Sequence, residues 1–280
     1  MTMVSDSPPV PRELLAAATV RLGERHEAEW LLMHALGVDR AWLFAHATDA
    51  LDAEAVVRFG ELVARRVAGE PVAYIVGSRG FWDLDLHVTP DTLIPRPETE
   101  LLVERALAWL PAAQALDVAD LGTGSGAVAL ALARERPRAR VLATDASAAA
   151  LAVARENARR HGLERVRFAQ GDWCAALGQA RFDLVVSNPP YIEATDPHLV
   201  RGDLRFEPAA ALASGADGLE AIRRIVHDAR DHLVAGGGLL LEHGWNQGAA
   251  VRTLLETAGY ADVFTALDVE GRDRVSGGRC

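Results

Sequence analysis

The chain has 280 residues, half of them hydrophobic, and a formal net charge of −10. That length predicts two domains and at least one large core, and the acidic balance disfavours non-specific binding to nucleic acid or anionic membrane. Neither of the two cysteines has zinc or disulfide-framework spacing, and no uncharged stretch reaches the roughly 18 apolar residues of a membrane span. We therefore expect a cytoplasmic protein without a structural metal or a membrane segment.

The first part of the chain has helical periodicity from Pro11 to about Gly69. Apolar residues recur there at spacings of three and four, as in the sets Ala28, Leu31, Leu32, Ala35 and Leu36, and Val56, Phe59, Val63 and Val67. Asp52 is placed to cap the last of these helices, and glycines 23, 37 and 69 mark expected helix ends. Residues 1–78 are predicted to form a small all-helical domain in which the isolated His26, His34 and His46 are structural or solvated.

The next segment alternates apolar and polar residues from Phe81 to Val88, which predicts a short hairpin in a linker over residues 79–95. A helix is expected to follow at the start of a third region, residues 96–280. Pro97 lies near its first turn, and Glu98 and Glu100 suit its positive end.

From Leu116 the pattern alternates between strands and helices. The expected strands are LDVADLG, RVLATD, RVRFAQGD, FDLVVSN and GGLLLEHG, and the helical runs between them are AVALALARER, ALAVARENARRHG and LEAIRRIVHDARDHL. This alternation predicts an α/β fold, with a mostly parallel sheet and helices on both faces. The closing RVSGGRC is poorer in apolar residues than an ordinary last strand.

The informative residues sit where these strands end, which is where parallel sheets bind ligands. Gly122, Thr123, Gly124, Ser125 and Gly126 follow the first strand and Asp145 ends the second. Asp172 and Trp173 follow the third strand, and Asn188 ends the fourth. Four successive strands thus direct polar or flexible residues to one rim of the sheet.

These residues fit an adenosine pocket without a phosphate cradle. GTGSG departs from the dinucleotide pattern G-x-G-x-x-G, which argues against NAD, and no P-loop lysine is present. Asp145 suits two ribose hydroxyls, although it could instead cap the helix that begins near Ser147. Trp173 and Asp172 could hold an adenine ring and its amine, although Trp173 could also be a core aromatic.

The stretch FDLVVSNPPY runs a buried strand into a stiff turn. Proline fixes φ near −65° and restricts the residue before it, so Pro189 and Pro190 hold this turn almost rigid. A turn of that kind serves to present Asn188.

Together these motifs resemble those of S-adenosylmethionine-dependent methyltransferases that methylate a planar nitrogen. The narrower resemblance is to the release-factor glutamine methyltransferases, the HemK/PrmC family. It rests on TLIPRPETE at 92–100, SNPPYI at 187–192, DPHLVRGDLRFEPAAAL at 196–212, LLLEHG at 239–244 and the helical domain in front.

The resemblance implies a Rossmann-like methyltransferase domain over 96–280. It also implies transfer of a methyl group from S-adenosylmethionine to N5 of the glutamine in the Gly-Gly-Gln motif of class I peptide-chain release factors. Asn188, Pro189 and Tyr191 would be catalytic, and with Pro190 they would bind the substrate. The cofactor would be held by Gly122, Thr123, Gly124, Ser125, Gly126, Asp145, Asp172, Trp173 and Asn188.

The chemistry agrees with these residue types. An amide nitrogen is a poor nucleophile, and two acceptors aimed at its hydrogens would return electron density to it: the side-chain oxygen of Asn188 and the backbone carbonyl of Pro189. Tyr191 could face the sulfonium through a cation–π contact or could simply be a packed aromatic. Arg96 and the PETE turn either close over the site or form a structural ion pair.

Three alternatives remain at this point. The same motif could serve an amino methyltransferase acting on adenine or guanine of nucleic acid, although no basic target-recognition module is visible. A related family acts on a glutamine of a ribosomal protein but departs from this sequence after the IPR of TLIPRPETE. A cofactor-binding interaction protein without catalysis would not need both acceptors. The leading expectation is a monomeric enzyme whose helical domain docks the release factor and which has no nucleic-acid substrate.

Overall fold

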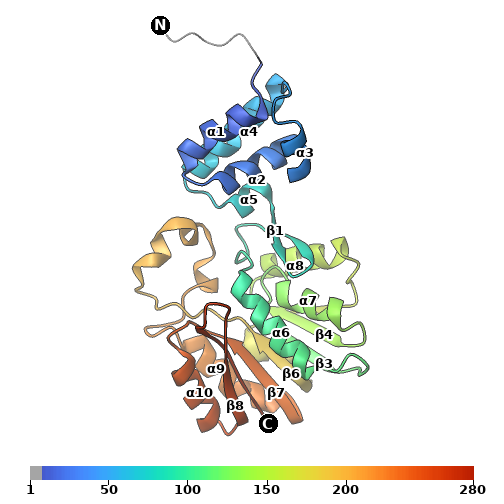
Figure 1. Cartoon of the computed structure of the whole chain (residues 1–280). Helices are drawn as coiled ribbons and strands as arrows, with labels where there is room; N and C mark the ends of the chain where they lie inside the picture. Colours follow the sequence, from blue (N-terminus) through green and yellow to red (C-terminus); the bar gives the residue numbers. More distant parts are fainter. Residues whose placement is uncertain (1–7) are drawn as a thin grey trace. The chain divides into compact units, whose positions relative to one another are not determined.

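The computed structural model describes residues 8–280, which separate into two compact units that divide between Gly77 and Ser78. The described part of the first unit contains helices and no strands (Figure 1). Its helices are α1 (Pro11–Leu22), α2 (Arg25–Leu36), α3 (Arg40–Ala45), α4 (Ala53–Val67) and α5 (Val72–Val76).

Local sequence signals set the ends of these helices. Asp52 caps α4 by accepting a hydrogen bond from the Ala55 N–H at 2.7 Å, as expected. Gly23 and Gly37 end α1 and α2 in the left-handed conformation. Gly69, by contrast, lies one residue beyond Ala68, which caps α4. The apolar faces of the helices meet in one core around Leu31, Leu32, Phe59 and Val63.

The second unit begins with the predicted hairpin, in which β1 (Ser78–Phe81) pairs antiparallel with β2 (Leu84–His87). A 3₁₀ turn, η1 (Pro97–Thr99), then leads into α6 (Glu100–Trp109). The strands that follow are β3 (Asp117–Leu121), β4 (Arg140–Asp145), β5 (Arg167–Gln170), β6 (Phe182–Ser187), β7 (Leu233–Glu242), β8 (Ala261–Leu267) and β9 (Asp273–Arg279). The remaining α-helices are α7 (Ala127–Glu135), α8 (Ala148–Arg160), α9 (Glu220–Ala229) and α10 (Gly248–Thr257). Every strand and helix expected between 116 and 244 is confirmed.

The seven strands form one sheet in the order β5-β4-β3-β6-β7-β9-β8. The pairs from β5 to β7 are parallel, whereas β9 runs antiparallel to both of its neighbours. Successive strands therefore proceed outward from β3 to β5 on one side and from β6 to β7 on the other, where β9 then lies between β7 and the edge strand β8. The boundary between β3 and β6 is the switch point, at which α/β sheets open a crevice for ligands.

Helices cover both faces of the sheet (Figure 1). Adjacent residues of a strand point to opposite faces, so each strand contributes side chains to two cores. Val118 packs in the core on the side of α6 and α7, while Ala119 packs on the side of α9 and α10. In β7, Leu240 and Leu239 divide in the same way. Strands buried on two faces explain the near-continuous apolar runs in the sequence.

The closing strand is well formed in spite of its polar and glycine-rich sequence. A Cβ atom at Gly277 would lie 2.5 Å from both the Leu239 carbonyl oxygen and a methyl carbon of Leu240. The neighbouring strand and side chains fill the space that an apolar side chain would take elsewhere. Glycine therefore contributes to the packing of β9 by leaving that space open.

Within residues 8–280, no helix is both long enough and apolar enough to cross a lipid bilayer.

Candidate active site

The predicted site residues converge at the switch point of the sheet. Leu121 at the end of β3 pairs with Ser187 at the end of β6, so the loop starting at Gly122 and the turn starting at Asn188 leave the sheet side by side. This strand order brings together two motifs that lie far apart in the sequence, and sequence periodicity alone does not specify it.

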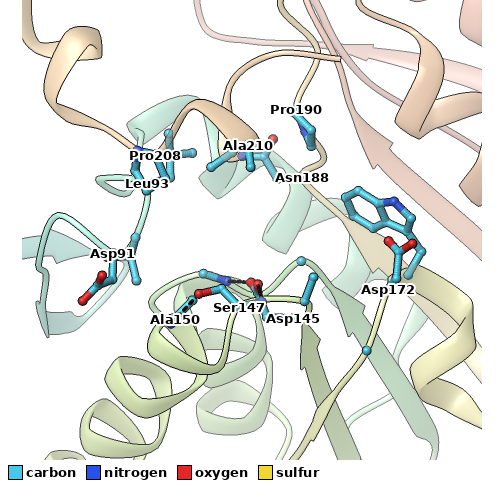
Figure 2. Close-up of a pocket in the computed structure, with 17 residues that line it drawn as sticks. Asp91, Leu93, Asp145, Ser147, Ala150, Asp172, Asn188, Pro190, Pro208 and Ala210 are labelled. Atoms are coloured by element: carbon cyan, nitrogen blue, oxygen red, sulfur yellow. Dashed lines mark hydrogen bonds between the residues drawn. The ribbon is translucent and has the colours of Figure 1, made fainter. Parts of the chain in front are cut away.

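A cavity of about 290 Å³ opens at this rim (Figure 2). Asp145 and Ser147 lie across the opening from Asn188, Pro190 and Ala210 in the view. The lining residues are Asp91, Thr92, Leu93, Gly122, Gly124, Asp145, Ala146, Ser147, Ala150, Gly171, Asp172, Trp173, Asn188, Pro190, Pro208, Ala210 and Ala211. All four of the predicted strand ends thus contribute to one cavity.

Gly122 gives the aromatic ring of Trp173 room to lie against the backbone. Gly122 has φ +72°, and a Cβ atom there would be 3.1 Å from Cζ3 of Trp173. Trp173 itself has φ +49°, a conformation that is costly for a bulky residue. Strain of this kind persists where the surrounding structure needs a particular side-chain position, which favours a binding role for Trp173 over a purely packing role.

Asp145 is not the cap of the helix that follows it. Ser147 caps α8 by accepting from the Ala150 N–H at 3.1 Å. The two carboxylate oxygens of Asp145 instead accept from the Gly124 and Ser147 N–H groups, each at 2.9 Å. These bonds fix the carboxylate at the cavity wall and leave further lone pairs on both oxygens.

Asp172 also lines the cavity, but one of its carboxylate oxygens accepts from Nη1 of Arg224 at 2.5 Å. The remaining oxygen can still meet a ligand amine. Sequence reasoning did not anticipate this ion pair, because Arg224 comes from the distant helix α9.

A smaller recess of about 50 Å³ adjoins the cavity and shares Leu93, Gly122, Gly124 and Asn188 with it. Its other lining residues are Pro95, Arg96, Thr99, Asp120, Thr123, Ser125, Ala127 and Val128. Of the predicted glycine loop, Thr123 and Ser125 belong to this recess. Gly126 lines neither space: a Cβ atom there would lie 3.1 Å from a Leu130 methyl carbon, so Gly126 serves the packing of α7.

Asp120, which sequence reasoning passed over, is fully buried at this recess. Its carboxylate accepts from the Thr123 hydroxyl at 2.7 Å and from the Ala129 N–H at 3.1 Å. Burial raises the pKa of Asp120 to about 7, although these two hydrogen bonds oppose the shift. A buried acid in the apolar strand DVADL was the available signal.

Asn188 has one end of its amide occupied. Its Nδ2 donates to Oγ1 of Thr99 at 3.0 Å, so its Oδ1 is the end left for another donor. Pro190 lines the cavity, whereas Pro189 is buried and lies outside the lining. The turn therefore presents Asn188 as expected, and the role of the Pro189 carbonyl stays a prediction.

Tyr191 also lies outside the cavity lining. Its hydroxyl donates to Oε1 of Glu242 at 3.2 Å, and its ring packs against the core on the α9 and α10 side. Burial raises the pKa of Tyr191 and keeps the phenol neutral. This position favours the packed-aromatic interpretation over a direct contact with a sulfonium.

Arg96 forms an ion pair with the buried Glu207, whose other oxygen accepts from the Ile94 N–H at 3.2 Å. The pair ties the segment carrying Leu93 to the segment carrying Pro208, and both segments line the cavity. Arg96 thus forms the expected ion pair and also lines the smaller recess, so its role at the site stays a prediction.

Among the described residues that line the main cavity are three aspartates and no lysine, arginine or histidine. Such a wall suits a cationic ligand and disfavours a phosphate group. Residues 8–280 contain no cluster of three or more histidine, cysteine or acidic side chains arranged to hold a metal ion.

Two family models match the chain. The one described as the PrmC N-terminal domain matches residues 12–77, and the one described as the methyltransferase small domain matches residues 98–215. A solved methyltransferase from Pyrococcus furiosus superposes with a TM-score of 0.54 at 19% identity, covering 77% of this chain and 96% of that chain. At that identity the likeness shows the fold alone.

Curated relatives match over almost the whole length. A release factor glutamine methyltransferase of Xylella fastidiosa strain Temecula1 is 61% identical, covering 97% of this chain and 98% of the relative. A release factor glutamine methyltransferase of Bordetella pertussis is 53% identical, covering 91% of this chain and 94% of the relative. The motif resemblance is thereby confirmed: the chain belongs to the family of release factor glutamine methyltransferases, the HemK/PrmC family.

Proposed function

We propose that this protein transfers the methyl group of S-adenosylmethionine to N5 of the glutamine in the Gly-Gly-Gln motif of class I release factors. The observation that carries this proposal is that Asn188 lines the same cavity as Gly122 and Asp145. Asn188, which can bind the target amide, and Gly122 and Asp145, which can bind a nucleoside, then face one cavity.

The cavity residues fit the cofactor. Asp145 offers fixed acceptors for ribose hydroxyls, and Trp173 supplies a flat surface beside a glycine backbone for the base. The volume of about 290 Å³ is near the lower end of small-molecule pockets. The acidic lining suits a sulfonium. In the adjoining recess, the raised pKa of Asp120 allows its carboxyl group to be neutral or charged near neutral pH.

Bound S-adenosylmethionine supplies an electrophilic methyl group. The work of the protein is then to hold a poorly nucleophilic amide in line with that methyl. Asn188 would accept one hydrogen of the target NH₂ through Oδ1, and the Pro189 carbonyl would accept the other. Because the proline turn is rigid, these acceptors need no reorganisation as charge develops on nitrogen.

The helical unit would dock the protein substrate. Its surface carries exposed apolar side chains, among them Phe44 at 90% and Val20 at 85% exposure, and such residues are common anchors of protein contacts. We further propose that the enzyme acts as a monomer in the cytoplasm, where its substrate is found.

Transfer of labelled methyl groups to three acceptors tests the proposal: a release factor, the same factor with its motif glutamine replaced, and DNA. We expect label in the intact factor alone. Equal labelling of the glutamine variant would contradict the assigned acceptor atom, and labelling of DNA alone would support the nucleic-acid alternative.

A further inference from the structure

Glu242 is the most deeply buried acidic side chain next to the candidate active site whose role the proposed reaction leaves unexplained. It ends β7, it is 0% exposed, and its Oε1 accepts from the Tyr191 hydroxyl at 3.2 Å. The Thr99 hydroxyl also lies close enough to lower the pKa of Glu242 by hydrogen bonding. The other oxygen, Oε2, has no hydrogen-bond partner among the described residues. A buried carboxylate is costly, so its retention calls for a function.

Thr99 connects Glu242 to the amide that faces the substrate. Its Oγ1 accepts from Nδ2 of Asn188 at 3.0 Å, and its side chain is buried in the turn η1. A hydroxyl carries a single proton. Since the Thr99 oxygen accepts from Asn188, its own proton is free to be donated to Glu242.

Above its pKa of about 7 the Glu242 carboxyl is ionised and can only accept hydrogen bonds, so in that form it sets the direction of the whole chain. The order runs from Asn188 Nδ2 to Thr99 and from Thr99 to Glu242, with Tyr191 donating to the same carboxylate. The two ends of an asparagine amide are nearly equal in shape and opposite in hydrogen-bonding character. Fixing Nδ2 on Thr99 therefore decides that an acceptor, Oδ1, faces the cavity.

We propose that Glu242 is a positioning residue that acts through the Thr99 hydroxyl to hold the Asn188 amide with Oδ1 toward the target nitrogen. The inference rests on the proposed function, because only an NH₂ substrate requires an acceptor at this place. Reversal of the amide would set an NH₂ group against the NH₂ group of the substrate.

Glu242→Gln is the informative variant because it keeps the shape and adds a donor. The introduced amide can donate to the Thr99 oxygen and leave the Thr99 proton for Asn188, which favours the reversed Asn188 amide. We expect kcat to fall about 10–100-fold, as is usual for partners that orient a reacting group. The KM for the release factor and the affinity for S-adenosylhomocysteine should stay within about threefold.

Two conservative substitutions at Thr99 separate the loss of its hydroxyl from a change of shape. Thr99→Val removes the hydroxyl at constant shape and should lower kcat about as much as Glu242→Gln, whereas Thr99→Ser retains the hydroxyl and should restore most of the rate. The double variant Thr99→Val with Glu242→Gln should be no slower than the slower single variant, since both changes break one chain.

Thr265→Val serves as the matched control. Thr265 lies in β8 of the same sheet, and its hydroxyl is hydrogen-bonded to Arg252 at 2.6 Å and to Ser276 at 2.7 Å, away from the cavity lining. This variant also loses a hydrogen-bonded hydroxyl, and we expect its kcat to match that of the unaltered enzyme.

A readout independent of catalysis is the NMR signal of the Asn188 side-chain NH₂ with S-adenosylhomocysteine bound, assigned by its loss in Asn188→Asp. One proton should be protected from solvent exchange in the unaltered protein and in Thr99→Ser. Protection should be lost in Glu242→Gln and in Thr99→Val.

Several outcomes would overturn the inference: normal kcat in both Glu242→Gln and Thr99→Val, a Thr99→Ser variant as slow as Thr99→Val, or an unchanged Asn188 signal in Glu242→Gln. A rate loss matched by weaker S-adenosylhomocysteine binding would likewise reject it in favour of a cofactor effect. Failure of the unaltered enzyme to methylate release factor would reject the proposed function instead, and the NMR comparison would still report on the amide.

Discussion

The orientations of the Asn188 and Trp173 side chains are set by neighbouring residues. Asn188 sits at the end of β6 with its nitrogen on Thr99, and Trp173 holds φ +49° with its ring against Gly122. Both depend on a small or polar neighbour supplied by another strand or turn. Single substitutions can therefore test the hold on the target amide separately from the hold on the cofactor.

Replacing Asn188 by alanine should lower kcat about 10²–10³-fold, the usual cost of removing one preorganised polar contact from a reacting group. Binding of S-adenosylhomocysteine, followed by calorimetry, should change much less. Asn246→Ala is a suitable control because this exposed asparagine follows β7 outside the cavity lining. Turnover near normal in the Asn188 variant would remove the role assigned to its oxygen.

Gly122→Ala should weaken cofactor binding through Trp173. The added Cβ would lie 3.1 Å from the ring, so the ring must shift. Gly162→Ala is matched in backbone, with φ +67° against +72°, yet has no atom within 4 Å. Both variants should lose about 1–2 kcal/mol of stability, the cost of alanine in the left-handed region. Only Gly122→Ala should lose cofactor affinity, and an equal loss in both would contradict the contact with Trp173.

Between elements, charged side chains tie distant segments to the site. The Arg96–Glu207 pair joins two lining segments, and Glu242 joins the end of β7 to the turn η1. Burial is the largest influence on both acids and raises the pKa of each, to about 7 for Glu242. Removing the partner of one of these buried carboxyls should therefore cost more unfolding free energy than breaking an exposed ion pair.

Arg96→Met would leave Glu207 buried without its cation. We expect a loss of the order of 2–3 kcal/mol in the free energy of unfolding, at the low end for a broken buried pair because Glu207 can take up a proton. Urea denaturation would measure it. Arg140→Met, which breaks the exposed pair with Asp117, should cost about 0–1 kcal/mol. Equal losses would show that burial of Glu207 is not the deciding factor.

Glu242→Gln should gain stability relative to the unaltered protein as pH rises. The folded pKa of about 7 exceeds the ordinary 4.5, so between these values the folded state keeps a proton that the unfolded chain releases. Unfolding free energy therefore falls through this range by up to about 3 kcal/mol, since about 2.5 pKa units correspond to about 1.36 kcal/mol each. The variant lacks this loss.

Denaturation of both proteins at pH 5 and pH 8 checks this prediction. Asp120, whose pKa is also about 7, contributes equally to both proteins and cancels in the difference. An identical pH dependence in the two proteins would contradict the raised pKa of Glu242.

In the molecule as a whole, the two units have separate cores. The core of the first unit is drawn from residues between Leu14 and Val76. The two cores of the second unit are drawn from residues at or after Phe81. Separate cores favour independent folding of each unit. Recognition of a large protein substrate can then be divided from the chemistry of transfer.

A fragment of residues 78–280 should therefore bind S-adenosylhomocysteine about as tightly as the full chain. If the helical unit docks the release factor, the KM of the fragment for the whole factor should rise at least about tenfold, which corresponds to about 1.4 kcal/mol of lost binding. A short peptide carrying Gly-Gly-Gln should be methylated equally by both forms. An unchanged KM for the whole factor would reject the docking role.

Local sequence was enough to predict the α/β pattern, the helical front, the glycine loop and the NPPY turn. These features follow from local rules: periodicity of burial, capping, and the fixed φ of proline. The identity of the chemistry was also local, because Asn188 and Asp145 end their own strands. Gly126 and Tyr191 show the limit, since the motif contains them whereas the cavity lining does not.

The residues that support the site became apparent only in the folded chain. The strand order places β6 between β3 and β7, and side-chain contacts with Asn188, Arg96 and Tyr191 then bring three separate motifs to one rim, those of Thr99, Glu207 and Glu242. Their partners lie between 51 positions (Tyr191 and Glu242) and 143 positions (Thr99 and Glu242) away along the chain. Hydrogen bonds of that range depend on strand order and packing, which no local pattern encodes, so the orientation of the Asn188 amide could be read only after folding.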